Sequence, residues 1–167
     1  TMTIKKLQQA TKEISGYRDD IIQRLLKYSA TDMLLFWGSD KGLMQQQEQK
    51  WGPLLEWASR EFEGKFVKTY GLDVPEENKT SGYRLKFFLE NLSDKELAAF
   101  YLAALNMRSV LLAAALVKGK INAEQAFQAA YLEELYQAEH WGNDQEAEQK
   151  RMERKQELQD IEKFLKS

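Results

Sequence analysis

The chain has 167 residues, of which 43% are hydrophobic and 30% charged, and its formal net charge is −2. A chain of this length can bury one core without disulfides, so residues 1–167 are expected to form a single compact domain. With only nine Gly and two Pro, the composition favours long helices over a turn-rich β-sandwich or a disordered chain. We therefore predict an all-α fold of about six to eight helices.

Several functional classes are excluded at this level. The chain has no cysteine, which rules out disulfides, thiolate nucleophiles and cysteine-ligated metals. Its slightly negative charge gives no overall attraction for nucleic acid or anionic lipid. Polar residues interrupt the most apolar stretch, Leu97–Val117, so it falls short of the ~18 uncharged residues of a membrane span. We predict a buried core helix there, with no membrane insertion.

The first third of the chain has helical periodicity. Apolar residues recur at helical spacing from Ile4 to about Tyr28, and Gly16 divides this stretch into two short helices. The apolar run Met33–Trp37 is too short to assign to helix or strand. Pro53 suits the first turn of a helix that runs to Glu63.

The middle of the chain contains one β-prone segment. Lys65–Tyr70 alternates in character and predicts at most a short isolated strand, and residues 71–81 are expected to form a surface loop. A short helix is predicted over Gly82–Asn91. The sequence Ser93-Asp94-Lys95-Glu96 is a capping box that begins a long apolar helix, which ends before Gly119.

Two further helices complete the chain. Asn122 is placed to cap a helix over Ala123–Trp141, and another helix runs from Asp144 nearly to the C-terminus. In this last helix the basic residues Lys150, Arg151, Arg154 and Lys155 alternate with glutamates, which predicts a solvated face. Its apolar stripe is confined to the final turns, at Leu158, Ile161 and Leu165.

Catalytic motifs are absent from the sequence. His140 is the only histidine, which excludes a paired-histidine zinc helix and a di-iron bundle, and its position near a helix end predicts a structural role. Neither of the common phosphate-binding glycine motifs occurs. We assign no catalytic residue, metal or cofactor.

One carboxylate is out of place. On a continuous helix over Ala123–Trp141, Glu134 falls in the middle of an arc formed by Phe127, Ala130, Tyr131, Ala138 and Trp141. An unpaired charge there would be costly to bury, so Glu134 is paired, protonated, or part of a binding surface. Arg108 is equally out of place in the long apolar helix, and a buried Arg108–Glu134 pair is the structural alternative to a binding role.

Tryptophans raise a similar question, because large aromatics dominate both cores and interface hot spots. We expect each of Trp37, Trp51, Trp57 and Trp141 to lie in the core.

The segment from Leu132 to Asp144 resembles the Glu-x-x-Gln-x-x-x-Trp-Gly signature of the Atp-twelve family, which comprises assembly chaperones for the catalytic head of the F-type ATP synthase. Further similar motifs occur upstream in the same order. They are Thr31-Asp32-Met33-Leu34, the run Gln47-x-x-x-Trp51-Gly52-Pro53-Leu54-Leu55-x-Trp57-Ala58, and Ser109 in the apolar helix.

This resemblance implies a protein that binds the unassembled α subunit of the ATP synthase head and shields the surface that the β subunit later covers. It implies no cofactor and no nucleic acid. The expected partner-binding residues are Glu134, Gln137, Trp141, Glu133 and Tyr131. The segment after Trp141 resembles the α-proteobacterial branch, which implies a bacterial cytoplasm, with the mitochondrial matrix as the alternative, and a monomer.

The sequence departs from the family pattern in three places. Members usually begin with a small β-rich domain, to which nothing here corresponds. Gly52 replaces the usual Asp, and Phe36-Trp37-Gly38 replaces a Tyr-Arg-Ala-like segment. Two other functions stay open: a helical scaffold that self-associates through the last helix, and a small acid–base enzyme built on Glu134.

Overall fold

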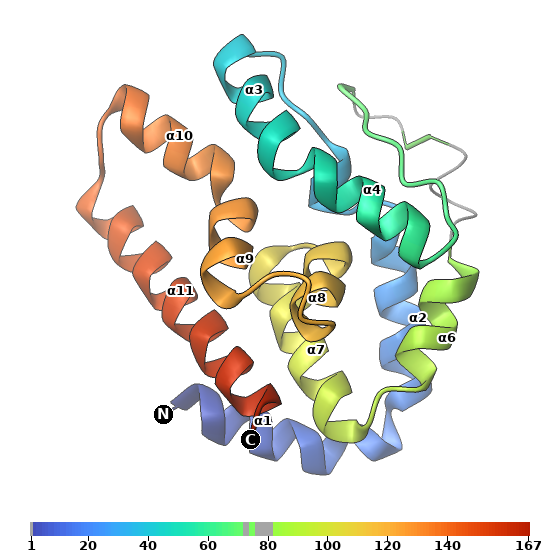
Figure 1. The fold of residues 1–167 in the computed structure, drawn as a ribbon. Coiled ribbons are helices and arrows are strands. Elements are labelled where there is room, and N and C mark those ends of the chain that lie inside the picture. Colours follow the sequence, from blue (N-terminus) through green and yellow to red (C-terminus); the bar gives the residue numbers. More distant parts are fainter. Residues whose placement is uncertain (1, 72–73, 76–81) are drawn as a thin grey trace.

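The computed structural model describes residues 2–71, 74–75 and 82–167, most of which lie in helices (Figure 1). The all-α prediction is confirmed. The α-helices are α1 (Met2–Glu13), α2 (Arg18–Ser29), α3 (Lys41–Lys50), α4 (Gly52–Glu61), α6 (Tyr83–Glu90), α7 (Asp94–Met107), α8 (Val110–Val117), α9 (Ala123–Ala130), α10 (Leu132–Trp141) and α11 (Gln145–Leu165). Single 3-10 turns occupy Ile14–Gly16 (η1) and Met33–Leu35 (η2).

The core is built around α7 and α8, which lie at the centre of the molecule (Figure 1). Every residue of α8 from Val110 to Leu116 is buried, as expected of a helix that is apolar on all sides. Helices α1, α2, α4, α9 and α11 pack against this pair. The prediction of a buried apolar segment is therefore confirmed.

The long helix predicted after the capping box is interrupted. The capping box itself forms, with hydrogen bonds of 3.0 and 3.1 Å between Ser93 and Glu96. The helix then stops at Arg108, whose φ of 56° is left-handed, and α8 begins anew with Ser109 as its cap. The Ser109 hydroxyl accepts a hydrogen bond of 2.9 Å from the Leu112 amide.

A second predicted helix is also divided. At Tyr131 the chain bends (φ −107°, ψ 19°), so the expected helix over Ala123–Trp141 is α9 followed by α10. The bend accompanies burial of the Tyr131 ring, whose hydroxyl donates to the Asn106 carbonyl oxygen at 2.8 Å. Because of these two divisions, the described residues form more and shorter helices than the six to eight expected.

The β-prone segment Lys65–Tyr70 contributes a single parallel bridge rather than a strand. Thr69 pairs with Phe36: the Trp37 amide donates to the Thr69 carbonyl at 2.9 Å, and the Thr69 amide donates to the Leu35 carbonyl at 2.6 Å. The apolar run that the sequence left unassigned is thus the 3-10 turn η2 plus one bridge residue. Most of the predicted loop over residues 71–81 lies outside the described residues.

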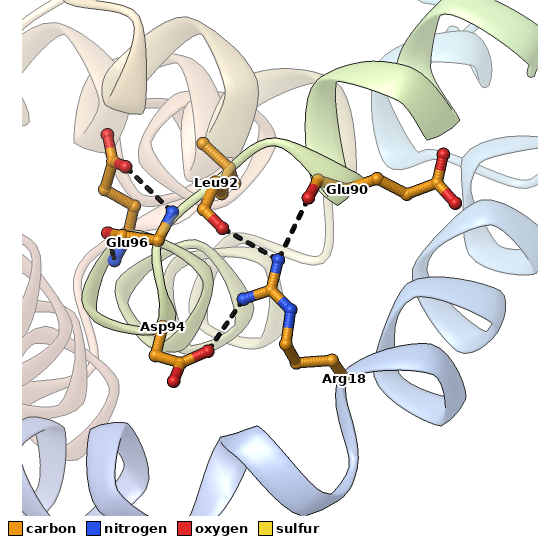
Figure 2. A network of polar contacts seen from close by, with 6 residues as sticks. Arg18, Glu90, Leu92, Asp94 and Glu96 are labelled. Atoms are coloured by element: carbon orange, nitrogen blue, oxygen red, sulfur yellow. Dashed lines mark hydrogen bonds and ion pairs between the residues drawn. The ribbon is translucent and has the colours of Figure 1, made fainter.

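An arginine joins three helices on one side of the core, as Figure 2 shows. Arg18, at the start of α2, forms an ion pair of 2.8 Å with Asp94 in the first turn of α7. Its other terminal nitrogen donates to the carbonyl oxygens of Glu90 and Leu92, at 3.2 and 2.7 Å. One guanidinium therefore connects the start of α2 with the end of α6 and the start of α7.

Candidate functional site

Helices α10 and α11 form a hairpin at one side of the molecule (Figure 1). Gly142 ends α10 with a φ of 98°, a conformation that other residues rarely adopt. Asp144 then caps α11, and its side chain accepts a hydrogen bond of 3.3 Å from the Glu146 amide. The signature-like segment of the sequence is therefore a helix, a glycine turn and the start of a second helix.

A polar contact fixes α10 to α3. The Tyr136 hydroxyl donates to Asp40 at 2.6 Å, and this bond lowers the pKa of the Asp40 carboxyl and raises the pKa of the Tyr136 phenol. A Cβ atom on Gly42 would lie 2.4 Å from the Tyr136 hydroxyl oxygen, so any larger residue at this position would displace that hydroxyl. His140 stacks on Tyr136 with ring centroids 4.0 Å apart. Its structural role is as predicted.

A cleft of about 450 Å³ opens where α1, α7, α10 and α11 meet. We call it the α10–α11 cleft. Its walls contain both aliphatic and charged side chains. The lining residues are Thr3, Lys6, Leu102, Leu105, Asn106, Arg108, Tyr131, Glu134, Lys150, Arg151, Arg154 and Glu157.

Glu134 lies in the wall of this cleft with 45% of its side chain exposed. Its two carboxylate oxygens are each 3.9 Å from a guanidinium nitrogen, one of Arg108 and one of Arg151. The Arg108–Glu134 pair considered as the structural alternative is present but is not buried, because the Arg108 side chain is 66% exposed. Exposed pairs of this kind stabilise a fold by about 0–1 kcal/mol.

The reason for this difference is the two helix divisions. The arc that surrounded Glu134 assumed one continuous helix, and the bend at Tyr131 changes the direction of α10 relative to α9. Similarly, Arg108 terminates α7 instead of lying inside a helix. Both charges are therefore at the surface, where neither is an anomaly.

Arg151 is a site residue that the sequence analysis missed. Its side chain is only 9% exposed, and it donates to the Asn143 side-chain oxygen at 2.9 Å. The predicted solvated basic face of α11 is thus wrong for this residue. It is also wrong for Lys155, which is half-buried over the Phe127 ring and forms an ion pair with Glu124 at 2.9 Å. The alternation of charges in α11 gave no signal that α9 would pack against it.

The floor of the cleft is held by Tyr131 and Asn106. Tyr131 is 7% exposed, and burial raises the pKa of its phenol to about 12. Asn106 accepts from the Tyr131 hydroxyl and donates to the Arg154 carbonyl at 3.2 Å and to Glu157 at 2.9 Å. These bonds join α7, the α9–α10 bend and α11 beneath Glu134.

On α10, four of the expected partner-binding residues are exposed: Glu133, Glu134, Gln137 and Trp141. Trp141 is 85% exposed, so the expectation that it lies in the core is wrong. Trp37 and Trp51 are buried as predicted, and Trp57 is partly buried. A bulky aromatic with this exposure on a fixed helix is typical of an interaction surface.

Neither a metal-binding cluster nor a membrane-spanning helix occurs in the part of the chain that the structure describes. Within residues 2–71, 74–75 and 82–167 no cluster of acidic residues and histidine could hold a metal ion. None of the described helices combines the length and hydropathy needed to cross a bilayer.

Comparison with known proteins gives consistent results. Residues 1–59 match the family model described as ATP12 chaperone protein. Protein atp12, mitochondrial, of Schizosaccharomyces pombe is 26% identical over 161 residues, which cover 87% of this chain and 54% of that protein. This chain therefore spans about half the length of that relative.

Solved structures extend the match to nearly the whole chain. The crystal structure of Atp12 from Paracoccus denitrificans superposes with a TM-score of 0.87 at 27% identity, covering 93% of this chain and 67% of that one. The crystal structure of a putative chaperone from Agrobacterium tumefaciens superposes with a TM-score of 0.83 at 28% identity, covering 95% of this chain and 60% of that one. Sequence and fold therefore agree that the chain is similar to ATP12 chaperone proteins.

Proposed function

We propose that this chain is an assembly chaperone domain that binds the unassembled α subunit of the F-type ATP synthase head. It shields the surface that the β subunit later covers. The observation that carries this proposal, together with the similarity to ATP12 chaperone proteins, is the exposed face of α10, on which Trp141 is 85% exposed. A large exposed aromatic on a helix whose backbone is anchored offers a partner much apolar surface to bury.

The contacts of α10 explain how this face is held in place. Tyr136 fixes one side of the helix to Asp40 at the start of α3, and Gly142 and the capped α11 fix its end. Its remaining face presents Glu133, Gln137 and Trp141 to solvent. In this proposal those three residues contact the client directly, and Glu134 contacts it at the edge of the cleft.

Tyr131 takes a different part in the proposal. Its ring is buried and its hydroxyl is bonded to Asn106, so it sets the direction of α10 instead of touching the client. Function then consists of binding and release by exchange with another subunit. It requires no cofactor and no chemical step.

The proposed setting is a bacterial cytoplasm, consistent with the similarity to the Paracoccus protein. The mitochondrial matrix is the alternative, given the similarity to a mitochondrial relative in fission yeast. The proposed working state is a monomer in complex with one client.

A self-associating scaffold is less well supported. Such a module would use the apolar stripe in the last turns of α11, but Leu158 and Ile161 of that stripe are buried and Leu165 is partly buried. The stripe packs inside the same molecule, against α1, α7 and α9. It is therefore not free to bind a second copy.

Aggregation of the purified α subunit provides the test. Wild-type chain at an equal molar amount should keep the subunit in solution, and Trp141→Ala should lose most of this protection. Tyr83→Ala is the matched control, because Tyr83 is an equally exposed aromatic on α6, away from the α10 face. The proposal fails if wild type gives no protection, or if both variants lose it equally.

A further inference from the structure

We propose that the α10–α11 cleft binds an acidic segment of the client, in which carboxylates alternate with aliphatic side chains. The charge of the cleft lining supports this proposal. Five cationic side chains and two carboxylates line the cleft, whereas the chain as a whole carries a net charge of −2. The cleft is thus locally positive on a protein that is otherwise slightly negative, which favours an anionic occupant.

The two carboxylates do not neutralise all of these cations. Glu134 lies between Arg108 and Arg151, and Glu157 lies 3.9 Å from Arg154 and accepts from Asn106. Among the described residues, Lys6 and Lys150 have no carboxylate within ion-pair distance. They come from different helices, α1 and α11, so an anionic chain entering the cleft can meet a free ammonium group from each.

The aliphatic part of the cleft lining also supports this proposal. Leu102 and Leu105 of α7 line the cleft, and Leu105 is exposed to solvent although α7 is the central helix of the fold. An exposed leucine surrounded by cations suits a segment that carries both apolar and acidic side chains. A volume of about 450 Å³ accommodates a few such side chains, since ligand sites typically measure ≈ 300–1,000 Å³.

The same lining disfavours nucleic acid. Proteins that bind single strands stack bases on exposed aromatic rings. The aromatic residue in this cleft, Tyr131, is buried with its hydroxyl bonded to Asn106, so its ring does not offer a stacking surface. A flat lipid bilayer would not enter the cleft either.

Assigning the acidic segment to the client rests on the proposed function, but the preference of the cleft for such a segment can be measured separately. The probe is a fluorescent peptide of alternating glutamate and leucine, titrated with the folded chain. A peptide with glutamine in place of glutamate is the control. We expect the acidic peptide to bind more tightly, and its affinity to fall as the salt concentration rises.

Charge reversals locate the binding site. Lys6→Glu and Lys150→Glu should each weaken peptide binding by roughly tenfold, because each replaces an attraction with a repulsion across a few ångströms. Lys5→Glu and Lys163→Glu are matched controls: they make the same change at exposed positions of α1 and α11 that do not line the cleft. Each control should retain affinity within about twofold.

Three results would overturn this inference: equal binding of the glutamine peptide, equal loss in the control variants, or tighter binding of a single-stranded oligonucleotide of similar charge. Binding of the α subunit, measured in parallel, separates the two proposals. If the subunit binds and the peptide does not, the cleft inference fails alone. If the peptide binds and the subunit does not, the proposed function fails and the preference of the cleft stands.

Discussion

Asp32 and Ser109, 77 residues apart in the sequence, share a buried hydrogen bond of 2.6 Å from the Ser109 hydroxyl to the Asp32 carboxylate. The same carboxylate accepts from the Leu34 amide at 3.0 Å and from the Leu111 amide at 2.9 Å. It therefore caps η2 and α8 at once. By fixing the start of α8, it also fixes the break at which Arg108 turns toward the α10–α11 cleft.

Asp32→Asn should destabilise the fold. The asparagine oxygen can replace one acceptor atom, but its NH₂ group then faces an amide or hydroxyl donor that is left unpaired in the core. A buried unsatisfied group costs about 1–3 kcal/mol, and the free energy of unfolding should fall by that amount in a urea titration. Asp19→Asn, at an exposed position in the first turn of α2, is the control and should change it by less than about 1 kcal/mol. Equal effects would show that the Asp32 network is not structural.

The Asp32 network also predicts a pH dependence. Burial raises the pKa of Asp32 to about 6, against the lowering effect of its hydrogen bonds. The folded state therefore binds the Asp32 proton more tightly than the unfolded chain does. Protonated Asp32 adds to the free energy of unfolding below pH ~4, and this contribution is lost as the pH rises to ~6.

Comparing wild type with Asp32→Asn isolates the contribution of Asp32 protonation to the free energy of unfolding. The wild-type advantage in unfolding free energy should shrink by up to about 3 kcal/mol between those pH values and stay constant above them. An advantage that grows with pH would mean that the hydrogen bonds outweigh burial and hold the pKa below its usual value.

Gly42→Ala should loosen α10 without unfolding the core. The new Cβ would displace the Tyr136 hydroxyl, which lies only 2.4 Å from its position, and would break the bond to Asp40. Amide hydrogen exchange should then accelerate in α10 and stay unchanged in α7. Tyr136→Phe removes the same bond without a clash and should reproduce the effect. Unchanged exchange in both variants would show that this contact does not hold α10 in place.

Local signals in the sequence predicted local structure well. The capping box at Ser93 and Glu96 forms as expected, and the apolar run after it is buried. The breaks at Arg108 and Tyr131 were missed because they depend on partners distant in sequence: Asp32 for the first and Asn106 for the second. A periodicity that looks continuous cannot reveal a bend produced by tertiary contacts.

A partner-binding role for the residues around Glu134 stays a prediction, and their surroundings depend on tertiary contacts in the same way. Glu134 is exposed and lies in the wall of a cleft, whereas the expected apolar surroundings assumed a straight helix. Arg151 and the cationic lining were missed because their surroundings come from four separate helices. Asp32 and Ser109 belong to two separate motifs that resemble the family. Only the fold shows that their side chains are hydrogen-bonded to each other.

Glu134→Gln should leave stability nearly unchanged. The carboxylate is half-exposed and 3.9 Å from each guanidinium, so removing its charge should alter the unfolding free energy by less than about 1 kcal/mol. Thermal unfolding followed by circular dichroism gives the measurement. A loss of several kcal/mol would instead indicate that the charge stabilises Arg151 in the folded state.

The exposed face of α10 is proposed to bind the unassembled α subunit of ATP synthase. The most direct measurement is a calorimetric titration of purified α subunit with wild type, Trp141→Ala and the control Tyr83→Ala, each shown to be folded. We expect one-to-one binding by wild type and by Tyr83→Ala, and at least about tenfold weaker binding by Trp141→Ala, since an anchor residue is worth about 2 kcal/mol or more. Absence of binding by the wild-type chain, or equal affinity in all three proteins, would contradict the proposal.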